Sequence, residues 1–595
     1  MIRLTPEQIS AKKQYLKNYM AASNAAAGSV LDANANVSSK NIATMSAELN
    51  KDINIQVNRS LIFDNIEKRF GTDLANEYVR QLESHELYTH DESSLNNYCA
   101  AVTLYPFLLN GLKGFGGESE APKHLASFCG SFVNLMFAIS SQLAGAVAAV
   151  EFLMYFDHFA KKDYGDDYLT THTKLIENQL QHVVYAINQP AAARGFQSIF
   201  FNISIYDKPY FESMFGNFTF PDENFTKPTY ESLDKLQRFF MKWFNKEREK
   251  AVLTFPVITA ATLNNGTTMV DKQFQEFLAE EYSEGNAFFT FTSDNAESLS
   301  SCCRLKNNVA EQVNDFSYSL GAGGVSTGSM NVITINVNRL IQDGRSLTEQ
   351  VEKIHKYQLA FKDLFKEYQD VGLLPTFSEG YIDIERQYLT IGVNGVVEAA
   401  EYLGFEISNN TEYKQWVSNL LKEISDLNKT NSAKYGCKFN TEFVPAENLG
   451  VKFAKWDKAD GYVVPRDCYN SYLYKVEDND ISVLDKFALH GKDTSQYLDG
   501  GSAYHCNLES YPTKEGFMKL LDVAVKEGCE YMCFNVAVTC CESCGFIDKR
   551  TLTKCSKCDS TNLSWATRVI GYLKKIKDFS PDRQKEANLR HYHVS

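Results

Sequence analysis

The sequence predicts a mixed α/β protein that ends in a small cysteine-rich domain. Short runs rich in β-branched residues, such as 331–337 and 388–393, alternate with longer stretches of helical periodicity, such as 346–370. This alternation is typical of folds in which helices cover a sheet. The sharpest change in composition comes after Phe534, where cysteines gather in predicted turns. These observations predict an α/β body followed by a C-terminal domain of different character.

The N-terminal part of the chain has a helical pattern. Leu4-Thr5-Pro6-Glu7 predicts a helix start, and 62–82 reads as one amphipathic run. We therefore expect a helical region over residues 1–85, the α/β body over 86–530 and the C-terminal domain over 531–595.

The composition fits a large enzyme. The chain has 595 residues, of which 44% are hydrophobic and 13% aromatic, so it can bury a sizeable core. Its net charge is −14 and its pI is near 5.4. We expect no nucleic-acid partner, because such partners need clustered Lys and Arg. A small anionic ligand in a local pocket stays compatible with this charge.

The cysteine count and the first residues predict a cytoplasmic, reducing location. The chain has 14 cysteines, and its first six residues lack a basic segment that leads into an apolar one. The uncharged stretch 125–150 is interrupted by Ser127, Asn134 and Gln142 and lacks flanking aromatic and basic belts. We expect a buried helix there and no membrane partner.

Two cysteine pairs predict a zinc site. Cys541 and Cys544 form one pair, and Cys555 and Cys558 form the other. Two such pairs at short separation bind Zn²⁺ tetrahedrally, because each pair closes a tight turn. A redox dithiol is the alternative for either pair alone. Four thiolates leave no open position for a substrate, so the zinc is expected to be structural and to contribute on the order of 10 kcal/mol to local folding.

The tail that follows the cysteine pairs carries a resemblance. The string Arg568-Val569-Ile570-Gly571-Tyr572 resembles the glycyl-radical segment of the anaerobic (class III) ribonucleotide reductases, where it also follows a four-cysteine zinc site. Further matches occur in the family's order and span most of the chain: Thr89-His90-Asp91, Cys99, Ser301-Cys302-Cys303-Arg304, Thr334-Ile335-Asn336, Thr390-Ile391-Gly392-Val393-Asn394-Gly395 and Pro445-Ala446-Glu447-Asn448.

The resemblance implies a fold and an activity. The fold is a ten-stranded α/β barrel with an inner finger loop that carries the radical cysteine, a helical N-terminal region and a small C-terminal zinc and glycyl-radical domain. The activity is the anaerobic reduction of ribonucleoside triphosphates to 2′-deoxyribonucleoside triphosphates, which supplies DNA replication. Periodicity by itself predicts only a mixed α/β protein.

Gly571 is the expected radical residue. A backbone Cα radical is stabilised by the flanking amide groups only if the centre can flatten, and glycine flattens at the least steric cost. A turn or helix-cap glycine is the alternative. The resemblance implies that a separate radical S-adenosylmethionine activase with an iron–sulfur cluster makes the radical, because this chain lacks the three-cysteine signature of such enzymes.

Two cysteines are the expected relay and partner in catalysis. The family's radical cysteine precedes an arginine at the loop tip, so Cys303 fits better than Cys302. Cys99 corresponds to the second active-site cysteine, on the opposite face of the ribose, which helps the 2′-hydroxyl group leave as water. The alternative for both neighbouring cysteines of the loop is simple core packing.

The segment Pro445, Ala446, Glu447 and Asn448 is expected to bind the substrate phosphates. Proline at a helix start loses only an N–H group that would be unpaired anyway, and the free amides that follow suit phosphate oxygens. The motif is weak in isolation, because most helix starts contact only water and capping groups.

The resemblance also predicts regulation. Glu120-Ala121-Pro122-Lys123 resembles a stretch that contacts a deoxynucleotide effector at a dimer interface, so Glu120 and Lys123 are expected effector contacts and the chain an allosteric homodimer. A polar helix N-terminus is the alternative reading. The first ninety residues lack the basic, glycine-containing opening of an ATP cone, so overall control by bound ATP or dATP is not expected.

The reductant is either formate or a thioredoxin-like protein. Formate-using relatives carry an asparagine in the second half of the radical loop, whereas the matching positions here read Gly328-Ser329-Met330-Asn331. Relatives without it have a nearby methionine and take electrons from a redoxin, which favours Met330 in that role. A shift of one residue would instead give Asn331 to formate, and core filling is a further reading of Met330.

Two other classes of protein stay open. Another glycyl-radical enzyme, such as a lyase or eliminase, would share the radical glycine but would not be expected to need the zinc pairs. A non-enzymatic zinc-ribbon protein would bind a partner and would not depend on Gly571. Thermal stabilisation of the fold by nucleotides would distinguish a reductase from both of these classes.

Overall fold

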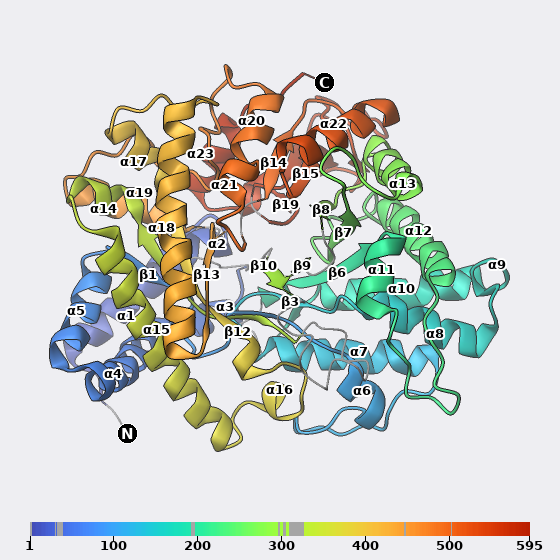
Figure 1. Ribbon diagram of the computed structural model, residues 1–595, viewed down its shortest axis with the longest axis horizontal. Coiled ribbons are helices and arrows are strands. Elements are labelled where there is room, and N and C mark those ends of the chain that lie inside the picture. The colour runs from blue at the N-terminus through green and yellow to red at the C-terminus, as the bar shows by residue number, and fades with distance from the viewer. Residues whose placement is uncertain are drawn as a thin grey trace.

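The computed structural model describes residues 3–29, 31, 40–191, 197–294, 298–301, 305–308, 326–444, 448–500, 503–569 and 571–594. A large sheet occupies the middle of the molecule, and helices surround it (Figure 1). This arrangement confirms the predicted mixed α/β fold.

The large sheet has eleven strands, and ten of them follow one another in the order β13-β12-β11-β2-β3-β6-β7-β8-β15-β14. From β2 to β8 all neighbours are parallel, as they are from β11 to β13 and between β14 and β15, whereas the two junctions β11–β2 and β8–β15 are antiparallel. The strands are β2 (Cys99–Ala101), β3 (Val147–Ala148), β6 (Phe201–Tyr206), β7 (Val257–Leu263), β8 (Phe289–Ser293), β11 (Gly328–Asn336), β12 (Gln387–Asn394), β13 (Lys438–Glu442), β14 (Tyr504–Asn507) and β15 (Tyr531–Asn535).

The two ends of this path meet. Glu442 at the end of β13 forms a parallel bridge with Gly500, which precedes β14. Asp499 N–H donates to the carbonyl of Thr441 at 2.9 Å, and Phe443 N–H donates to the carbonyl of Gly500 at 3.2 Å. The path therefore closes into a ring of two five-stranded parallel halves, which confirms the ten-stranded barrel. The eleventh strand, β1 (Leu87–Thr89), pairs with β11 outside this path.

A short hairpin lies inside the ring. Its strands β9 (Ser298–Ser301) and β10 (Leu305–Asn308) pair antiparallel, and β9 contacts β6, β7 and β8 while β10 contacts β11 (Figure 1). Because these contacts come from opposite sides of the ring, the hairpin crosses the barrel interior. Cys302 and Cys303 lie outside the described residues.

Helices cover the outside of the barrel. Their inward faces are apolar, as in α7, where the rings of Phe128 and Phe132 pack against Phe152 of α8. The larger outer helices are α7 (Leu125–Ser140), α8 (Phe152–Tyr164), α10 (Thr173–Ile187), α12 (Tyr230–Glu247), α13 (Lys272–Ser283), α15 (Leu347–Asp370), α18 (Thr411–Tyr435), α19 (Leu449–Ala459) and α22 (Lys514–Glu527). The shorter ones are α6 (Tyr105–Asn110), α9 (Tyr168–Thr171), α11 (Lys208–Phe215), α14 (Val337–Gln342), α16 (Pro375–Ser378), α17 (Val396–Tyr402), α20 (Val483–Leu489) and α21 (Lys492–Ser495), with a minor hairpin of β4 (Pro190–Ala191) and β5 (Gln197–Ser198).

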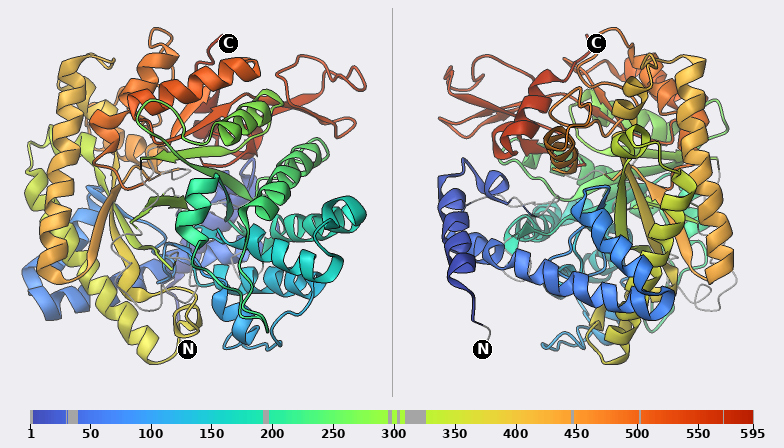
Figure 2. Two further views of the ribbon diagram at one scale, coloured as in Figure 1. Left: turned by 45° about the vertical axis from the view of Figure 1, so that its right-hand side comes forward. Right: turned by 90° about the vertical axis from the view of Figure 1, so that its left-hand side faces the viewer.

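The N-terminal region is helical, as predicted, and runs along one side of the molecule (Figure 2). Thr5 caps α1 by accepting from Gln8 N–H, and Pro6 opens the helix. The single amphipathic run expected over 62–82 was wrong, because Gly71 at φ +96° separates two helices. The helices are α1 (Pro6–Ala21), α2 (Ala25–Gly28), α3 (Ile42–Leu49), α4 (Lys51–Phe70) and α5 (Thr72–Glu83).

The uncharged stretch 125–150 is only partly helical. Helix α7 ends at Ser140, and Val147–Ala148 forms β3 of the barrel, so the expectation of one helix across the whole stretch was wrong. Periodicity could not separate the two, because a buried strand and a buried helix are both uniformly apolar. Of the helices in the described ranges, none has an apolar stretch long enough to span a bilayer.

A second, four-stranded sheet forms near the C-terminus. Its strands are β16 (Val538–Cys541), β17 (Ile547–Asp548), β18 (Leu563–Thr567) and β19 (Lys574–Lys575), in the order β17-β16-β18-β19. Helix α23 (Pro581–Leu589) follows and packs back towards the barrel. The small sheet extends from one end of the molecule (Figure 2). Strand β15 belongs to the large sheet, and the small sheet starts at Val538.

Candidate radical site and zinc site

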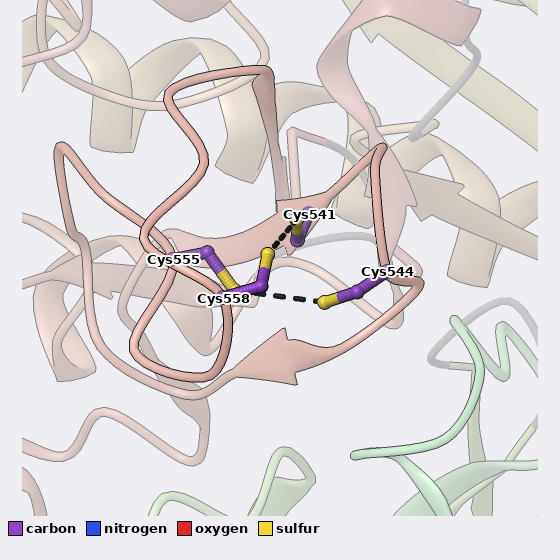
Figure 3. Close-up of side chains that lie close together, drawn as sticks. All are labelled: Cys541, Cys544, Cys555 and Cys558. Atoms are coloured by element: carbon purple, nitrogen blue, oxygen red, sulfur yellow. Dashed lines mark hydrogen bonds between the residues drawn. The ribbon is translucent and has the colours of Figure 1, made fainter.

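The four predicted zinc ligands converge (Figure 3). The sulfur of Cys541 lies 3.6 Å from that of Cys558, and the sulfur of Cys544 lies 3.7 Å from that of Cys555. All four sulfur atoms lie within 4.8 Å of one another. Four thiolates bound tetrahedrally at the usual Zn–S length stand about 3.8 Å apart, so the donors fit Zn²⁺.

Each cysteine pair lies on the same kind of turn. Gly545 N–H donates to the carbonyl of Cys541, and Asp559 N–H donates to the carbonyl of Cys555, both at 3.0 Å. Gly545 and Asp559 have φ of +75° and +56°, each directly after the second cysteine of its pair. This left-handed residue turns the chain back, so the two sulfur atoms of a pair face the same point.

The zinc site and Gly571 belong to one continuous piece of structure. Cys541 ends β16, and β16 pairs with β18. Directly after β18 the chain passes through Arg568 and Val569, which are buried, and reaches Gly571, which is partly exposed. We call the described residues Arg568, Val569, Gly571 and Tyr572 the glycine loop. The zinc site thus fixes the strand from which the glycine loop begins.

The tail after α23 binds the backbone of the glycine loop. Arg590 donates to the carbonyl of Val569 at 2.6 Å and to that of Arg568 at 3.3 Å, while its Nε donates to Glu586 at 2.7 Å. Burial opposes the charge of Arg590, but Glu586, Tyr472 and Tyr592 together outweigh it and raise the pKa of Arg590 above its usual range. Tyr472 Oη also donates to Val569 O, at 3.4 Å.

The barrel holds the loop from the other side. Asn535 on β15 accepts from Arg568 N–H and donates to the Arg568 carbonyl, both at 3.2 Å. The ring of Tyr572 meets Phe200 edge-on, with centroids 4.9 Å apart, and Phe255 at 5.7 Å. Contacts on both sides of Gly571 therefore hold the loop against the barrel.

Cys99 lies on the interior face of the barrel. It stands directly opposite Ser329, whose hydroxyl group lies 2.6 Å from that of Thr390. Asn428 of the outer helix α18 donates to Thr441 on β13 at 2.8 Å, so Thr441 faces outwards. Side chains alternate between the two faces along a strand, and paired residues of neighbouring strands share a face. Because Thr441 faces outwards, Thr390 faces the interior. Ser329 and Cys99 share the face of Thr390 and therefore also face the interior.

Met330 does not pair with Cys99. The register of β11 against β12 skips it, since Ser329 pairs with Tyr388 and Asn331 pairs with Leu389, so Met330 is the extra residue of a bulge. Met330 is buried and lines a cavity together with side chains of α4, α5 and α15. The sequence did not single out Ser329, which stands beside Cys99 instead.

The interior also holds amides without partners. Neither amide atom of Asn440 has a hydrogen-bond partner among the described residues, and Asn440 pairs with inward-facing Thr390. Asn202 Nδ2 likewise has none there; Phe201 packs against Phe132 of α7, so Asn202 faces the interior. Buried polar groups are normally satisfied, so these amides mark places for a polar ligand or water. Sequence reasoning missed both.

The predicted phosphate segment is described only at its end. Pro445, Ala446 and Glu447 lie outside the described residues. Asn448 is the buried cap of α19, which begins at Leu449, so the helix starts later than the proline implied. Ser580 Oγ donates to Asn448 Oδ1 at 2.7 Å, which ties this helix start to the chain after the glycine loop.

The predicted effector contacts lie on the surface. Glu120 and Lys123 are exposed and directly precede α7, which begins at Leu125. Asp163 of α8 accepts from Leu125 N–H at 2.7 Å and lies 2.8 Å from the ring of His124. The carboxylate of Asp163 therefore already occupies the N-terminus of α7. Within residues 120–123, Lys123 is the cationic side chain.

Comparisons with known proteins agree with this geometry. The family model described as anaerobic ribonucleoside-triphosphate reductase matches residues 47–593. A solved anaerobic ribonucleotide reductase superposes with a TM-score of 0.84 at 25% identity and covers 99% of this chain and 95% of its own. The Thermotoga maritima anaerobic ribonucleotide reductase in complex with dATP and CTP gives 0.82 at 26% identity, with 98% and 100% covered.

A more distant likeness concerns the fold alone. Hydroxyproline dehydratase from Clostridioides difficile superposes with a TM-score of 0.50 at 10% identity over 100% of both chains. No curated protein sequence matches the chain significantly.

Proposed function

Since this chain belongs to the anaerobic ribonucleoside-triphosphate reductase family, we propose that it stores a radical on Gly571 and relays it through Cys303 to the ribose of its substrate. The enzyme is an oxidoreductase that reduces ribonucleotides without oxygen. The observation that supports this assignment most strongly is the glycine loop itself, which a four-cysteine site anchors at one end and buried hydrogen bonds hold against the barrel.

The proposed relay moves one hydrogen atom at each step. The Gly571 Cα radical takes the hydrogen atom of the Cys303 thiol group, which leaves a sulfur radical. That sulfur takes a hydrogen atom from the ribose, and Cys99 then supports loss of the 2′-hydroxyl group as water. The inward position of Cys99 and the hairpin that crosses the barrel support this order.

The substrate is proposed to bind between the interior amides and the start of α19. Its phosphates would contact the segment Pro445, Ala446, Glu447 and Asn448, as the resemblance implies, and free amides at a helix start suit that charge. The amide of Asn440, which has no partner among the described residues, lies on β13, and β12 separates it from Ser329 on β11. It suits a ribose or base oxygen.

Effectors and partners follow from the same assignment. The relative that was solved with dATP and CTP supports nucleotide binding here. We propose that a deoxynucleotide binds near Glu120 and Lys123 at a homodimer interface, and that a radical S-adenosylmethionine activase with an iron–sulfur cluster generates the radical. Zinc on Cys541, Cys544, Cys555 and Cys558 has a structural role.

The proposed reductant is a thioredoxin-like protein or formate. Met330 lies at a bulge one residue beyond the partner of Cys99, so the geometry gives no direct sulfur contact between them. Ser329 is the residue of β11 that directly faces Cys99.

The decisive experiment is electron paramagnetic resonance at low temperature. After anaerobic incubation with a matching activase, S-adenosylmethionine and a reductant, the wild type should give a glycine-type doublet, and Gly571→Ala should give none. Zinc content and folding of both proteins serve as controls. A folded, zinc-loaded wild type that gives no signal with a competent activase would refute the radical assignment.

The relay is tested separately. Cys303→Ser should form the Gly571 radical in normal yield yet make no deoxynucleotide, because a hydroxyl hydrogen is too strongly bound to be transferred. Product is measured by chromatography after anaerobic turnover, with Cys302→Ser as the matched control that should keep activity. Deoxynucleotide formation by Cys303→Ser would exclude Cys303 as the relay.

A further inference from the structure

Two buried arginines meet beneath the glycine loop. Arg248 directly follows α12 as its C-cap residue, and Arg568 opens the glycine loop, 320 positions later in the chain. Arg248 Nη1 donates to the carbonyl of Ala287 at 2.7 Å, and Arg568 Nη2 donates to the same carbonyl oxygen at 3.0 Å. Because they share one acceptor, these nitrogen atoms lie within about 6 Å of each other.

Neither arginine has a counter-charge among the described residues. No carboxylate among the described residues forms an ion pair with either one. Each guanidinium lies instead over a ring, Arg248 over Phe244 at 4.2 Å and Arg568 over Phe289 at 5.0 Å. Arg248 Nε and Nη2 and Arg568 Nε are buried and have no hydrogen-bond acceptor in the described parts of the chain.

This arrangement is costly while the loop is docked. Buried charges are normally paired, and like charges at short range repel more strongly in a dry interior than in water. Burial, and then the charge of Arg568, lower the pKa of Arg248 well below its usual value, and burial lowers that of Arg568. Both the repulsion and the unmade hydrogen bonds disappear when Arg568 moves into water, so this contact opposes docking.

Docking is held by other groups. Arg590, Tyr472 and Asn535 bind the backbone of the loop, as described above. Arg568 and Val569 are only 2% and 1% exposed, so an activating protein cannot reach the whole loop while it is docked. A loop that was held by attractive contacts alone would seldom leave the barrel.

We propose that Arg248 is a positioning residue that opposes docking of the glycine loop, so that the loop leaves the barrel often enough for the radical to be installed. The proposal rests on the proposed function for its role in activation, but its physical part concerns only the loop. Arg248 acts through Arg568 and touches neither substrate nor Gly571.

The test compares hydrogen exchange of the glycine loop in two variants. Arg248→Met removes the charge and keeps apolar packing on Phe244, and Arg248→Lys keeps the charge as the conservative control. Two unit charges about 6 Å apart at an effective dielectric constant of about 20 interact strongly enough to change an equilibrium tenfold or more. Loop amides should therefore exchange about tenfold more slowly in Arg248→Met, and near the wild-type rate in Arg248→Lys.

Activation should follow the same order. The initial rate of radical formation, measured by electron paramagnetic resonance with a fixed amount of activase, should fall about tenfold in Arg248→Met and recover in Arg248→Lys. Hydrogen exchange needs no radical, so a failure of the radical assignment leaves the first test intact. If Arg248→Met does not fold, Arg248→Gln replaces it, because glutamine can still donate to the Ala287 carbonyl.

The opposite results would overturn the proposal. Unchanged or faster loop exchange in the uncharged variants would mean that Arg248 supports docking. An increase in loop protection on adding chloride or sulfate at constant ionic strength, lost in Arg248→Met, would show an anion-binding pair instead of a repulsive one.

Discussion

Removal of zinc from the four-cysteine site is expected to unfold residues 538–567 and to abolish ribonucleotide reduction. Structural zinc contributes on the order of 10 kcal/mol to the folding of such sites. The small sheet has only a small apolar cluster of its own, whose buried members are Cys540, Ile547, Ala566 and Leu573. Once β18 unfolds, the glycine loop loses the strand from which it begins.

The measurement combines zinc analysis, hydrogen exchange and turnover on Cys541→Ser. Exchange should become fast across 538–567 and the glycine loop, while β11 and β12 stay protected. Cys540→Ala is the matched control, because Cys540 is a buried neighbour whose sulfur is not part of the ligand set. A zinc-free Cys541→Ser protein with a protected loop and normal turnover would show that the site is not needed to hold Gly571.

Replacement of Arg590 by methionine is expected to release the glycine loop. The variant loses the hydrogen bonds to the carbonyls of Arg568 and Val569. It also loses the hydrogen bond of 2.7 Å to the Glu586 carboxylate. A hydrogen bond to a charged group contributes about 1.5–3 kcal/mol, so the loss of both bonds to the loop corresponds to a factor of 100 or more in the docked population. Turnover should fall by about that factor, because an undocked Gly571 cannot exchange hydrogen with the relay cysteine.

Arg590→Met is compared with Lys585→Met, which removes an exposed cation from α23, the helix that Arg590 directly follows. Loop exchange should rise in Arg590→Met only, and the rate of radical formation should not fall, because the loop is more accessible to the activase. This is the opposite of the effect expected for Arg248→Met. Normal turnover with a protected loop in Arg590→Met would show that Arg590 does not hold the loop against the barrel.

The convergence of the four-cysteine site could be predicted from the sequence in full. Its ligands are close in the chain, and the turn that joins each pair is a local structure, so spacing alone specifies the geometry. The positive φ of Gly545 and Asp559 shows how locally this information is encoded. The α1 cap at Thr5 and the helix that follows Ser346 are local in the same way.

Other predictions failed where local signals compete with packing. The stretch 125–150 contains both α7 and β3, since burial removes the polar residues that would reveal a period. The run 62–82 looked continuous because its apolar spacing resumes after Gly71. The start of α19 at Leu449, beyond the predicted proline, is a third case.

The sequence by itself determined the class of fold, the four cysteines that converge and, through resemblance, the family, because these depend on composition and on residues adjacent in the chain. It also named Gly571 as the candidate radical residue. Only the tertiary structure decided that Cys99 faces Ser329, that Arg590 binds the loop and that Arg248 meets Arg568. Arg248 and Arg568 come from segments 320 positions apart, and closure of the barrel brings them together. No local pattern records such a contact, since its cost and benefit exist only once the segments are packed.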